Sequence, residues 1–326
     1  MIGVDDPRLN VVNLFDGVIW RLGKFIRRFP LYDRINSATI VRRFCYDAAA
    51  HLADMPQRIN IETVNQCNGS CGFCPANTEN DPRLIQYMSD QLIQKIALEL
   101  AVENYRGSIA LFINNEPLID KRISQIIGIF RKSCPNNEIE LSTNGRLLTA
   151  ERYFSLFDSG LSRLIINNYN NKRRFTDKIG CALDQILSSD HGKLREYMQN
   201  TLILLKNKDE ILNSRAGKAP NKINVERYKY YQRNSCANPF RQMCILPDGR
   251  ISLCCEDFIG QVTVGNIDIE SIRAVWNGTV MCTMRAELQT NGRTTISTCQ
   301  RCDYGHLGGE KAKSLLRYFV KGFSKS

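Results

Sequence analysis

Between residues 58 and 205, short apolar runs alternate with longer stretches in which apolar residues recur at helical spacing. The short runs are typical of strands and the longer stretches are typical of amphipathic helices. The predicted strands are Arg58–Val64, Ser108–Ile113, Glu138–Thr143, Arg163–Asn167 and Thr201–Leu205. The predicted helices between them are Asp90–Tyr105, Lys121–Lys132, Ala150–Asp158 and Asp177–Leu187.

This order of elements predicts an α/β fold, because strands that alternate with helices form crossover units and a parallel sheet. A partial (β/α)6 TIM-like barrel fits the pattern, and its ligands would lie at the C-terminal ends of the strands. We assign residues 57–220 to this barrel and residues 1–56 to a helical lead-in that Pro56 closes. The small and polar residues of Asn213–Pro220 mark a linker.

Two further apolar runs follow the linker, at Gln242–Leu246 and Arg250–Leu253. Pro247-Asp248-Gly249 joins them, and such a junction predicts a β-hairpin. We therefore expect residues 221–310 to form a small cysteine-rich domain with a hairpin and a helix. Residues 311–326 are expected to form a basic amphipathic helix at the C-terminus.

Basic residues interrupt helical apolar patterns near both ends of the chain, at Leu14–Phe29 and Leu315–Phe323. The formal net charge is +11. Such helices either contact an anionic membrane surface or pack on the domain with their basic side chains reaching outward. We find no RNA-binding or helix-turn-helix signature, so nucleic acid is not an expected partner.

Composition limits the class and the compartment. Apolar residues make up 43% of the chain and charged residues 24%, as in a folded protein. The acidic N-terminal residues and the lack of an 18-residue apolar run argue against a signal peptide and favour a cytoplasmic location. In a reducing compartment, an odd count of 13 cysteines favours metal ligation over disulfides.

Three cysteines, Cys67, Cys71 and Cys74, directly follow the first predicted strand. Such a loop can hold three irons of a four-iron cluster, which leaves one iron open for a substrate or cofactor. A zinc site is the alternative, but it would need a fourth cysteine or histidine nearby. The next histidine in the chain is His191.

The C-x-x-x-C-x-x-C pattern, with Phe73 before its last cysteine, resembles the signature of the radical S-adenosylmethionine (SAM) enzymes. The resemblance implies a [4Fe-4S] cluster whose open iron chelates the amine and carboxylate of SAM. One electron then cleaves SAM to a 5′-deoxyadenosyl radical, which abstracts a hydrogen atom from the substrate. A reductase such as flavodoxin or ferredoxin is the implied electron donor.

Polar turns follow the next three strands, at Asn114–Pro117, Ser142–Gly145 and Asn167–Tyr169. They resemble the SAM-binding elements of the same superfamily. Glu116 matches the glutamate of its GGEP motif, which accepts a hydrogen bond from the SAM amine. The chain departs from this motif where Asn114 and Asn115 replace two glycines. The other cofactor-binding residues that the resemblance implies are Phe73, Ser142, Asn144 and Asn168.

A second cysteine-rich region contains Cys236, Cys244, Cys254, Cys255, Cys282, Cys299 and Cys302. A set of four can converge on one metal, and spacing alone leaves zinc and iron–sulfur open. That set is Cys236, Cys254, Cys299 and Cys302.

The segments around the set, CANPF, ILPDGRISLCCEDF, VGNI, Trp276-Asn277-Gly278 and CQRC, resemble a SPASM/twitch domain. This resemblance implies one auxiliary [4Fe-4S] cluster, held by the set of four with Cys254 rather than Cys255. We expect Cys45, Cys134, Cys181 and Cys282 to be small buried apolar residues.

A cluster with four cysteine ligands has no open iron, so the auxiliary site is expected to accept an electron during oxidation of the substrate. The resemblance implies that this substrate is carbohydrate-like or an aminocyclitol. Arg215 is our candidate to orient or deprotonate the substrate hydroxyl. An epimerase or dehydratase is an alternative, in which Cys255 or Cys244 returns a hydrogen atom to the substrate radical. Further alternatives are a peptide-modifying maturase and a zinc-binding interaction protein. The sequence predicts neither the substrate's identity nor the oligomeric state.

Overall fold

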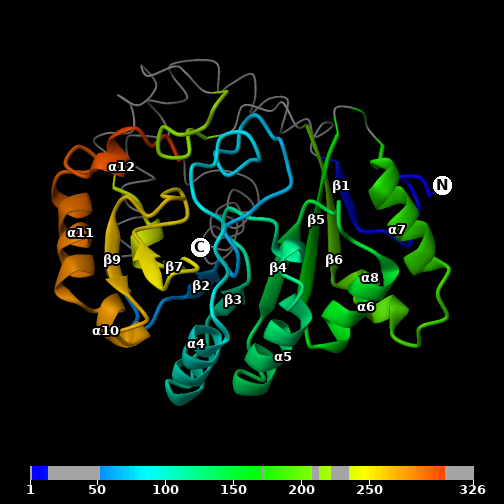
Figure 1. Ribbon diagram of the computed structural model, residues 1–326, viewed down its shortest axis with the longest axis horizontal. Coiled ribbons are helices and arrows are strands. Elements are labelled where there is room, and N and C mark those ends of the chain that lie inside the picture. The colour runs from blue at the N-terminus through cyan, green and yellow to red at the C-terminus, as the bar shows by residue number, and fades with distance from the viewer. Residues whose placement is uncertain are drawn as a thin grey trace, which may run out of the picture.

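The computed structural model of this chain describes residues 2–13, 52–170, 172, 174–207, 213–221 and 235–304. Its centre is one nine-stranded sheet with strand order β1-β6-β5-β4-β3-β2-β7-β8-β9 (Figure 1). All described pairs from β1 to β7 in this order are parallel, and the last two pairs are antiparallel. The fold is therefore α/β, as the sequence predicts.

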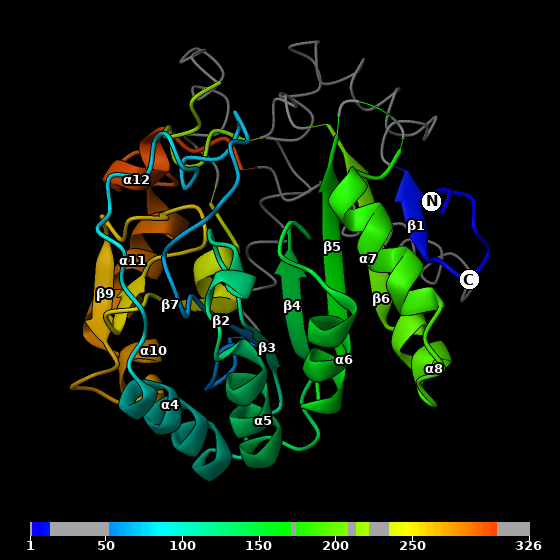
Figure 2. The same cartoon turned by 45° about the vertical axis from the view of Figure 1, so that its right-hand side comes forward.

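The predicted alternation of strands and helices is confirmed. The strands are β2 (Arg58–Ile61), β3 (Ser108–Ala110), β4 (Ile139–Thr143), β5 (Arg163–Tyr169) and β6 (Thr201–Lys206). The predicted helices are α4 (Asp90–Val102), α5 (Ile123–Ser133), α6 (Ala150–Asp158) and α7 (Asp177–Leu187). A further helix that was not predicted, α8 (Leu194–Gln199), precedes β6. Figure 2 shows these helices along one face of the curved sheet.

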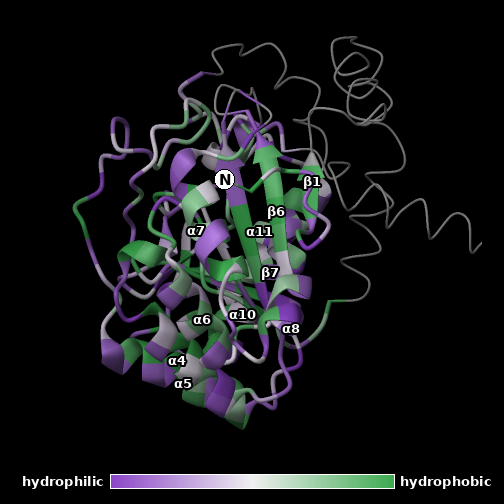
Figure 3. Cartoon of the chain, turned by 90° about the vertical axis from the view of Figure 1, so that its right-hand side faces the viewer, coloured by the Kyte–Doolittle hydropathy of each residue, from purple (hydrophilic) through white to green (hydrophobic). Residues whose placement is uncertain are grey.

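The helices and the sheet pack through alternating positions. Along β6, Thr201, Ile203 and Leu205 are buried, whereas the residues between them are only partly buried. Because successive strand residues point to opposite faces, one face of each strand packs on the helices and the other faces the interior of the barrel. In Figure 3, β6 is largely hydrophobic while the helices around it carry both hydrophilic and hydrophobic segments.

The N-terminal lead-in contains a strand that the sequence analysis did not predict. Strand β1 (Val11–Asn13) pairs in parallel with β6, so the prediction of a helical lead-in is wrong for these residues. The β-branched pair Val11-Val12 favours an extended backbone. The predicted helices at Leu14–Phe29 and at residues 311–326 lie outside the described residues.

The cysteine-rich region contains the predicted hairpin. Strands β7 (Gln242–Ile245) and β8 (Arg250–Ser252) are antiparallel, and Gly249 takes the left-handed conformation in their turn with φ of 81°. Strand β9 (Thr263–Asn266) extends the hairpin. The remaining elements are η1 (Pro117–Ile119), η3 (Asn238–Phe240), α10 (Ile272–Trp276), α11 (Thr279–Thr290) and α12 (Ser297–Gln300).

Strand β7 pairs in parallel with β2 over four residues, from Arg58 opposite Gln242 to Ile61 opposite Ile245. The hairpin therefore continues the barrel sheet. Backbone hydrogen bonds between β2 and β7 join the two cysteine-bearing regions. No described helix is long and apolar enough to cross a membrane.

Candidate active site

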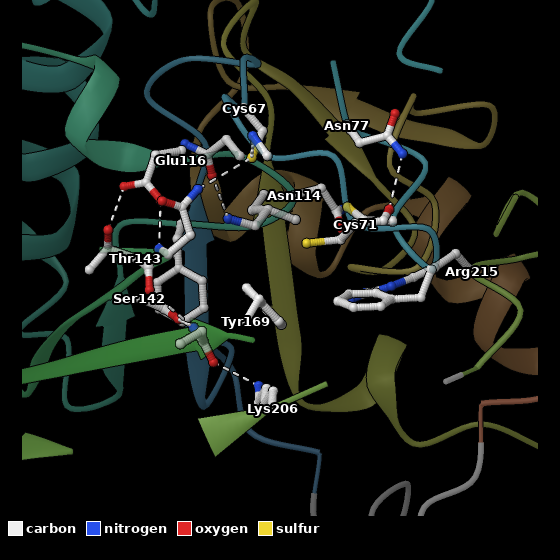
Figure 4. Close-up of a pocket in the computed structure, with 18 residues that line it drawn as sticks. Cys67, Cys71, Asn77, Asn114, Glu116, Ser142, Thr143, Tyr169, Lys206 and Arg215 are labelled. Atoms are coloured by element: carbon white, nitrogen blue, oxygen red, sulfur yellow. Dashed lines mark hydrogen bonds between the residues drawn. The ribbon is translucent and has the colours of Figure 1, made fainter. Parts of the chain in front are cut away.

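The loop after β2 places the first three cysteines at the C-terminal edge of the sheet. Cys67, Cys71 and Cys74 are partly buried and line a pocket of about 250 Å³ (Figure 4). Two hydrogen bonds shape the loop, from Cys74 N to Cys71 O at 3.0 Å and from Asn77 Nδ2 to Cys71 O at 3.0 Å. Burial raises the pKa of the Cys67 thiol to about 12, so a metal is needed to keep this sulfur as thiolate.

Glu116 lies in the wall of this pocket and is fully buried. Its Oε1 accepts hydrogen bonds from Thr143 Oγ1 at 2.6 Å and Leu118 N at 3.1 Å, and its Oε2 accepts one from Asn144 N at 2.7 Å. Burial raises the pKa of Glu116, and the hydrogen bonds from Asn144 and Thr143 oppose this effect. The carboxylate is thus held rigidly, with acceptor capacity left for a ligand amine.

The polar residues at the C-terminal ends of β4, β5 and β6 are linked across the pocket. Asn144 Nδ2 donates to Asn68 Oδ1 at 2.8 Å, which connects the β4 exit to the cysteine loop. Asn167 Nδ2 donates to Ser142 Oγ at 2.8 Å, and Lys206 Nζ donates to Asn167 Oδ1 at 2.7 Å. Ser142 and Asn144 therefore line the pocket as expected of cofactor-binding residues, whereas Asn167 and Lys206 were not predicted.

Asn168, a predicted cofactor-binding residue, points away from the pocket. Its Oδ1 accepts a hydrogen bond from Thr176 N at 2.9 Å, and its Nδ2 donates to Arg174 O at 3.1 Å. By strand alternation it shares the helix-covered face of β5 with Leu164 and Ile166. Its role is to fix the loop before α7, and we assign the pocket position to Asn167 instead.

Two aromatic side chains close the pocket near the cysteines. Phe73 is buried in the cysteine loop, and its ring centroid lies 5.4 Å from that of Tyr169 at the end of β5. The sequence analysis placed Tyr169 in a polar turn that resembles the SAM-binding elements, but it did not predict Lys206 as a pocket residue. The strand-end rule that identified the polar turns would have found Lys206 as well, since it is the last residue of β6.

Arg215 reaches the pocket from a backbone of unusual conformation. Arg215 and Ala216 have φ of 48° and 53°, and Gly217 follows with φ of 80°. Arg215 NH1 lies 3.3 Å from Glu256 Oε1, and this buried carboxylate raises the pKa of Arg215 above its ordinary value. The guanidinium stays protonated, so Arg215 can orient a hydroxyl but is unsuited to deprotonate one.

Gly217 permits this conformation and a close approach to the last cysteine pair. A Cβ at Gly217 would lie 2.6 Å from Arg301 Cβ. We expect Gly217→Ala to lower the free energy of unfolding by more than about 1 kcal/mol, measured by chemical denaturation. Ala216→Gly is the matched control and should be neutral or stabilising, because it relieves a left-handed alanine. Equal stability of Gly217→Ala and the parent would contradict the close packing.

The four cysteines of the second set are all buried, and Arg293 is buried beside them. Burial is the main cause of the raised pKa of Cys254, and the neighbouring thiols of Cys255 and of the other three cysteines in the set contribute to it. Arg293 donates to Cys302 O at 2.9 Å, and its charge opposes the effect of burial on the pKa of Cys299 and Cys302. In the described part of the chain, no three Cys, His, Asp or Glu side chains converge closely enough for a single metal ion.

The remaining cysteines are placed differently from one another. Cys134 is buried as predicted, but Cys181 and Cys282 are exposed, so the prediction that they are buried is wrong. Cys45 lies outside the described residues. Neither Cys244 nor Cys255 is among the described residues that line the pocket.

Comparison with protein families agrees with the two thiol sets. The model of the radical SAM superfamily matches residues 61–175, and that of the iron–sulfur cluster-binding SPASM domain matches residues 236–303. The chain is a radical SAM enzyme with a SPASM domain. Its cofactors are SAM and [4Fe-4S] clusters.

Individual proteins of known activity or structure are also similar to this radical SAM enzyme. A SAM-dependent 2-deoxy-scyllo-inosamine dehydrogenase from Niallia circulans is 24% identical over 247 residues, 75% of this chain and 92% of the relative. A GTP 3′,8-cyclase from Trichormus variabilis is 27% identical over 144 residues, 42% of this chain and 39% of the relative. The crystal structure of BtrN with AdoMet and 2-DOIA has a TM-score of 0.64 at 21% identity and covers 77% of this chain and 94% of BtrN.

The residues of the radical SAM enzyme fit these cofactors chemically. The first set offers three thiols beside a pocket with hydrogen-bond acceptors, which suits a cluster with one open iron. The second set offers four buried thiols and the buried cation of Arg293, which offsets the negative charge of a four-thiolate cluster.

Proposed function

We propose that this radical SAM enzyme is a dehydrogenase that oxidises a hydroxyl group of an aminocyclitol or a related carbohydrate-like substrate. The observation that carries the proposal is a direct contact between the pocket wall and the loop that contains Cys254. Asn114, which lines the pocket, donates a hydrogen bond to the carbonyl of Cys255, the residue next to Cys254. The dehydrogenase activity of the Niallia circulans relative supports the same reaction class.

In this proposal Cys67, Cys71 and Cys74 hold the SAM-binding cluster. Glu116 binds the SAM amine, and the polar side chains of Ser142 and Asn144 contact the rest of SAM, with Phe73 packed beside the cluster. A cluster bound there would supply the electron that cleaves SAM. Cys236, Cys254, Cys299 and Cys302 would hold a second cluster, which would take up the electron that substrate oxidation releases.

Arg215 is proposed to orient the substrate hydroxyl. Figure 4 shows Arg215 across the pocket from Glu116, with the cysteine loop between them. Its ion pair with Glu256 holds the guanidinium in place, and a fixed cation next to a hydroxyl lowers the cost of losing the hydroxyl proton. The proton itself leaves to another base or to water.

The contribution of Glu116 can be measured directly. We expect Glu116→Gln to weaken SAM binding about ten- to a hundredfold, because a charge-assisted hydrogen bond to the SAM amine is lost. Equilibrium binding of SAM to the reconstituted enzyme measures the effect, and iron content should be unchanged. SAM affinity equal to that of the parent would remove Glu116 from the binding site.

Turnover in D₂O tests the proposed reaction. Oxidation consumes one SAM per product, removes two electrons and brings no solvent hydrogen to the reacting carbon. An epimerase would instead give an isomer with deuterium at that carbon, returned by a thiol such as Cys255. Deuterium in the product that disappears in Cys255→Ala, while SAM cleavage persists, would overturn the dehydrogenase proposal.

Two finer proposals concern partners and location. A one-electron donor such as flavodoxin or ferredoxin should support SAM cleavage, and comparing initial rates with each protein identifies the better donor. We propose a cytoplasmic location with peripheral contact between the basic terminal segments and anionic lipid. Sedimentation of the enzyme with and without anionic vesicles tests this contact.

A further inference from the structure

Residues 254–258, which we call the auxiliary ligand loop, are held by three side chains from the barrel. Asn114 Nδ2 donates to Cys255 O at 3.0 Å, and Arg83 NH1 donates to Phe258 O at 3.0 Å. Arg215 pairs with the Glu256 side chain. The loop that carries Cys254 is thus fixed by residues that follow β2, β3 and β6.

Asn114 has a special place among these three contacts. It is buried, it lines the pocket, and it contacts the backbone of the loop at the residue that follows Cys254. One hydrogen bond connects the Asn114 amide to the Cys255 carbonyl. A short series of covalent bonds connects that carbonyl to the sulfur of Cys254. A glycine at position 114, as in the motif that this turn resembles, has no side chain to make this contact.

We propose that Asn114 is a positioning residue that couples substrate oxidation in the pocket to the auxiliary cluster. The inference rests on the proposed dehydrogenase function. The Asn114 amide holds the Cys255 carbonyl, and with it Cys254, against the pocket wall. It also provides a hydrogen-bonded route for the electron between the two sites.

The C–H bond of the substrate carbinol breaks when its hydrogen atom passes to the 5′-deoxyadenosyl radical. The resulting carbon radical would give one electron, by way of Asn114, to a cluster held by the four cysteines of the second set, and its hydroxyl would give a proton to base or water. A C=O double bond would form, and the electron would then leave to a one-electron carrier protein.

The first test compares Asn114→Ala with Asn200→Ala. Asn200 is an exposed asparagine outside the pocket, and its Nδ2 also donates one hydrogen bond to a backbone carbonyl, Glu196 O at 3.1 Å. With 2-deoxy-scyllo-inosamine as the probe, we expect Asn114→Ala to raise the ratio of 5′-deoxyadenosine to oxidised product about twofold to tenfold, the range for one lost hydrogen bond. Asn200→Ala should leave this ratio at the parent value.

The second test needs no substrate. In the background with Cys67, Cys71 and Cys74 replaced by alanine, the auxiliary cluster is isolated, and its EPR spectrum and midpoint potential can be measured by redox titration. Loss of the hydrogen bond from Asn114 should make the potential more negative, because the donor no longer withdraws charge from the loop carbonyl. Asn114→Ser, whose hydroxyl is too short to reach Cys255, is measured as well in case the alanine variant loads poorly.

The outcomes separate the two proposals. If the parent enzyme gives no oxidised product from the aminocyclitol or its carbohydrate-like analogues, the proposed function fails, and the EPR measurement still decides the role of Asn114. If the parent oxidises its substrate, and Asn114→Ala and Asn114→Ser both keep the parent's product ratio, EPR spectrum and midpoint potential, the inference about Asn114 is wrong.

Discussion

Replacement of Cys67, Cys71 and Cys74 by alanine should abolish SAM cleavage and leave about half of the parent's iron. The three thiols share one loop and one pocket, whereas the four thiols of the second set are buried and are not among the residues that line this pocket. If each set holds one four-iron cluster, removing the first set halves the iron and removes the site where SAM binds. Iron and sulfide analysis with chromatography of 5′-deoxyadenosine measures both effects.

Two exposed cysteines provide a matched control for this variant. Cys181 and Cys282 lie on helices outside both sets, so their replacement by alanine should leave iron content and SAM cleavage at the parent level. Formation of 5′-deoxyadenosine at the parent rate in the triple variant would show that the cluster is held elsewhere.

The second large effect is expected from Arg83→Met, which should lower the free energy of unfolding by about 3–5 kcal/mol. Arg83 NH1 lies 2.8 Å from Glu62 Oε2, and the Glu62 side chain is 0% exposed. The same guanidinium donates to Phe258 O and to Asn65 O. The substitution leaves a buried carboxylate without its cation and releases one attachment of the auxiliary ligand loop.

The pH dependence gives this prediction a distinctive sign. Burial raises the pKa of Glu62 to about 7, against the attraction of Arg83. A carboxyl group whose pKa is higher in the folded state than in the unfolded state binds its proton more tightly when the protein is folded. Its contribution to the free energy of unfolding is therefore present at low pH and is lost as pH rises through the folded-state pKa. Without Arg83 that pKa rises further. The loss in Arg83→Met should therefore be larger at pH 8 than at pH 6.

A double-mutant cycle with Glu62→Gln isolates the ion pair. Asp81, which also pairs with Arg83 at 2.8 Å, loses its cation in both proteins that carry Arg83→Met, so this loss cancels from the cycle. The Glu62→Gln/Arg83→Met protein contains no buried carboxylate at position 62, so it should lose less stability than the two single changes added together. Additive losses, or a loss in Arg83→Met that does not change with pH, would show that the pair is not the source of the effect. Denaturant unfolding at both pH values supplies the data.

Local pattern predicted most of the barrel, and pairing between distant segments accounts for what it missed. Helices α6 and α7 match the predicted residues from end to end, because their apolar spacing is decided within one or two turns. Strand β1 has three residues, and its partner β6 lies about 190 positions along the chain. A pattern of neighbouring residues cannot predict a pairing between segments so far apart in the sequence. The same holds for β7, whose partner is β2.

The candidate site shows the same division. The cysteine sets were predicted from spacing and motif, which do not depend on exact geometry. The choice of Asn168 over Asn167 depended on which face of β5 each side chain takes, and a shift of one residue reverses the face. Cys181 and Cys282 were expected to be buried because they lie in helical contexts, but a helix also has a solvent face.

The parallel ladder between β2 and β7 has a mechanical consequence. Moving the cysteine-rich region as a rigid lid away from the barrel would break a row of main-chain hydrogen bonds in the middle of the sheet. A hinge at this place is therefore costly, and the spacing between the two thiol sets is built into the backbone. Adaptation to substrates of different size is left to the loops at the strand ends, which can change length while the frame stays the same.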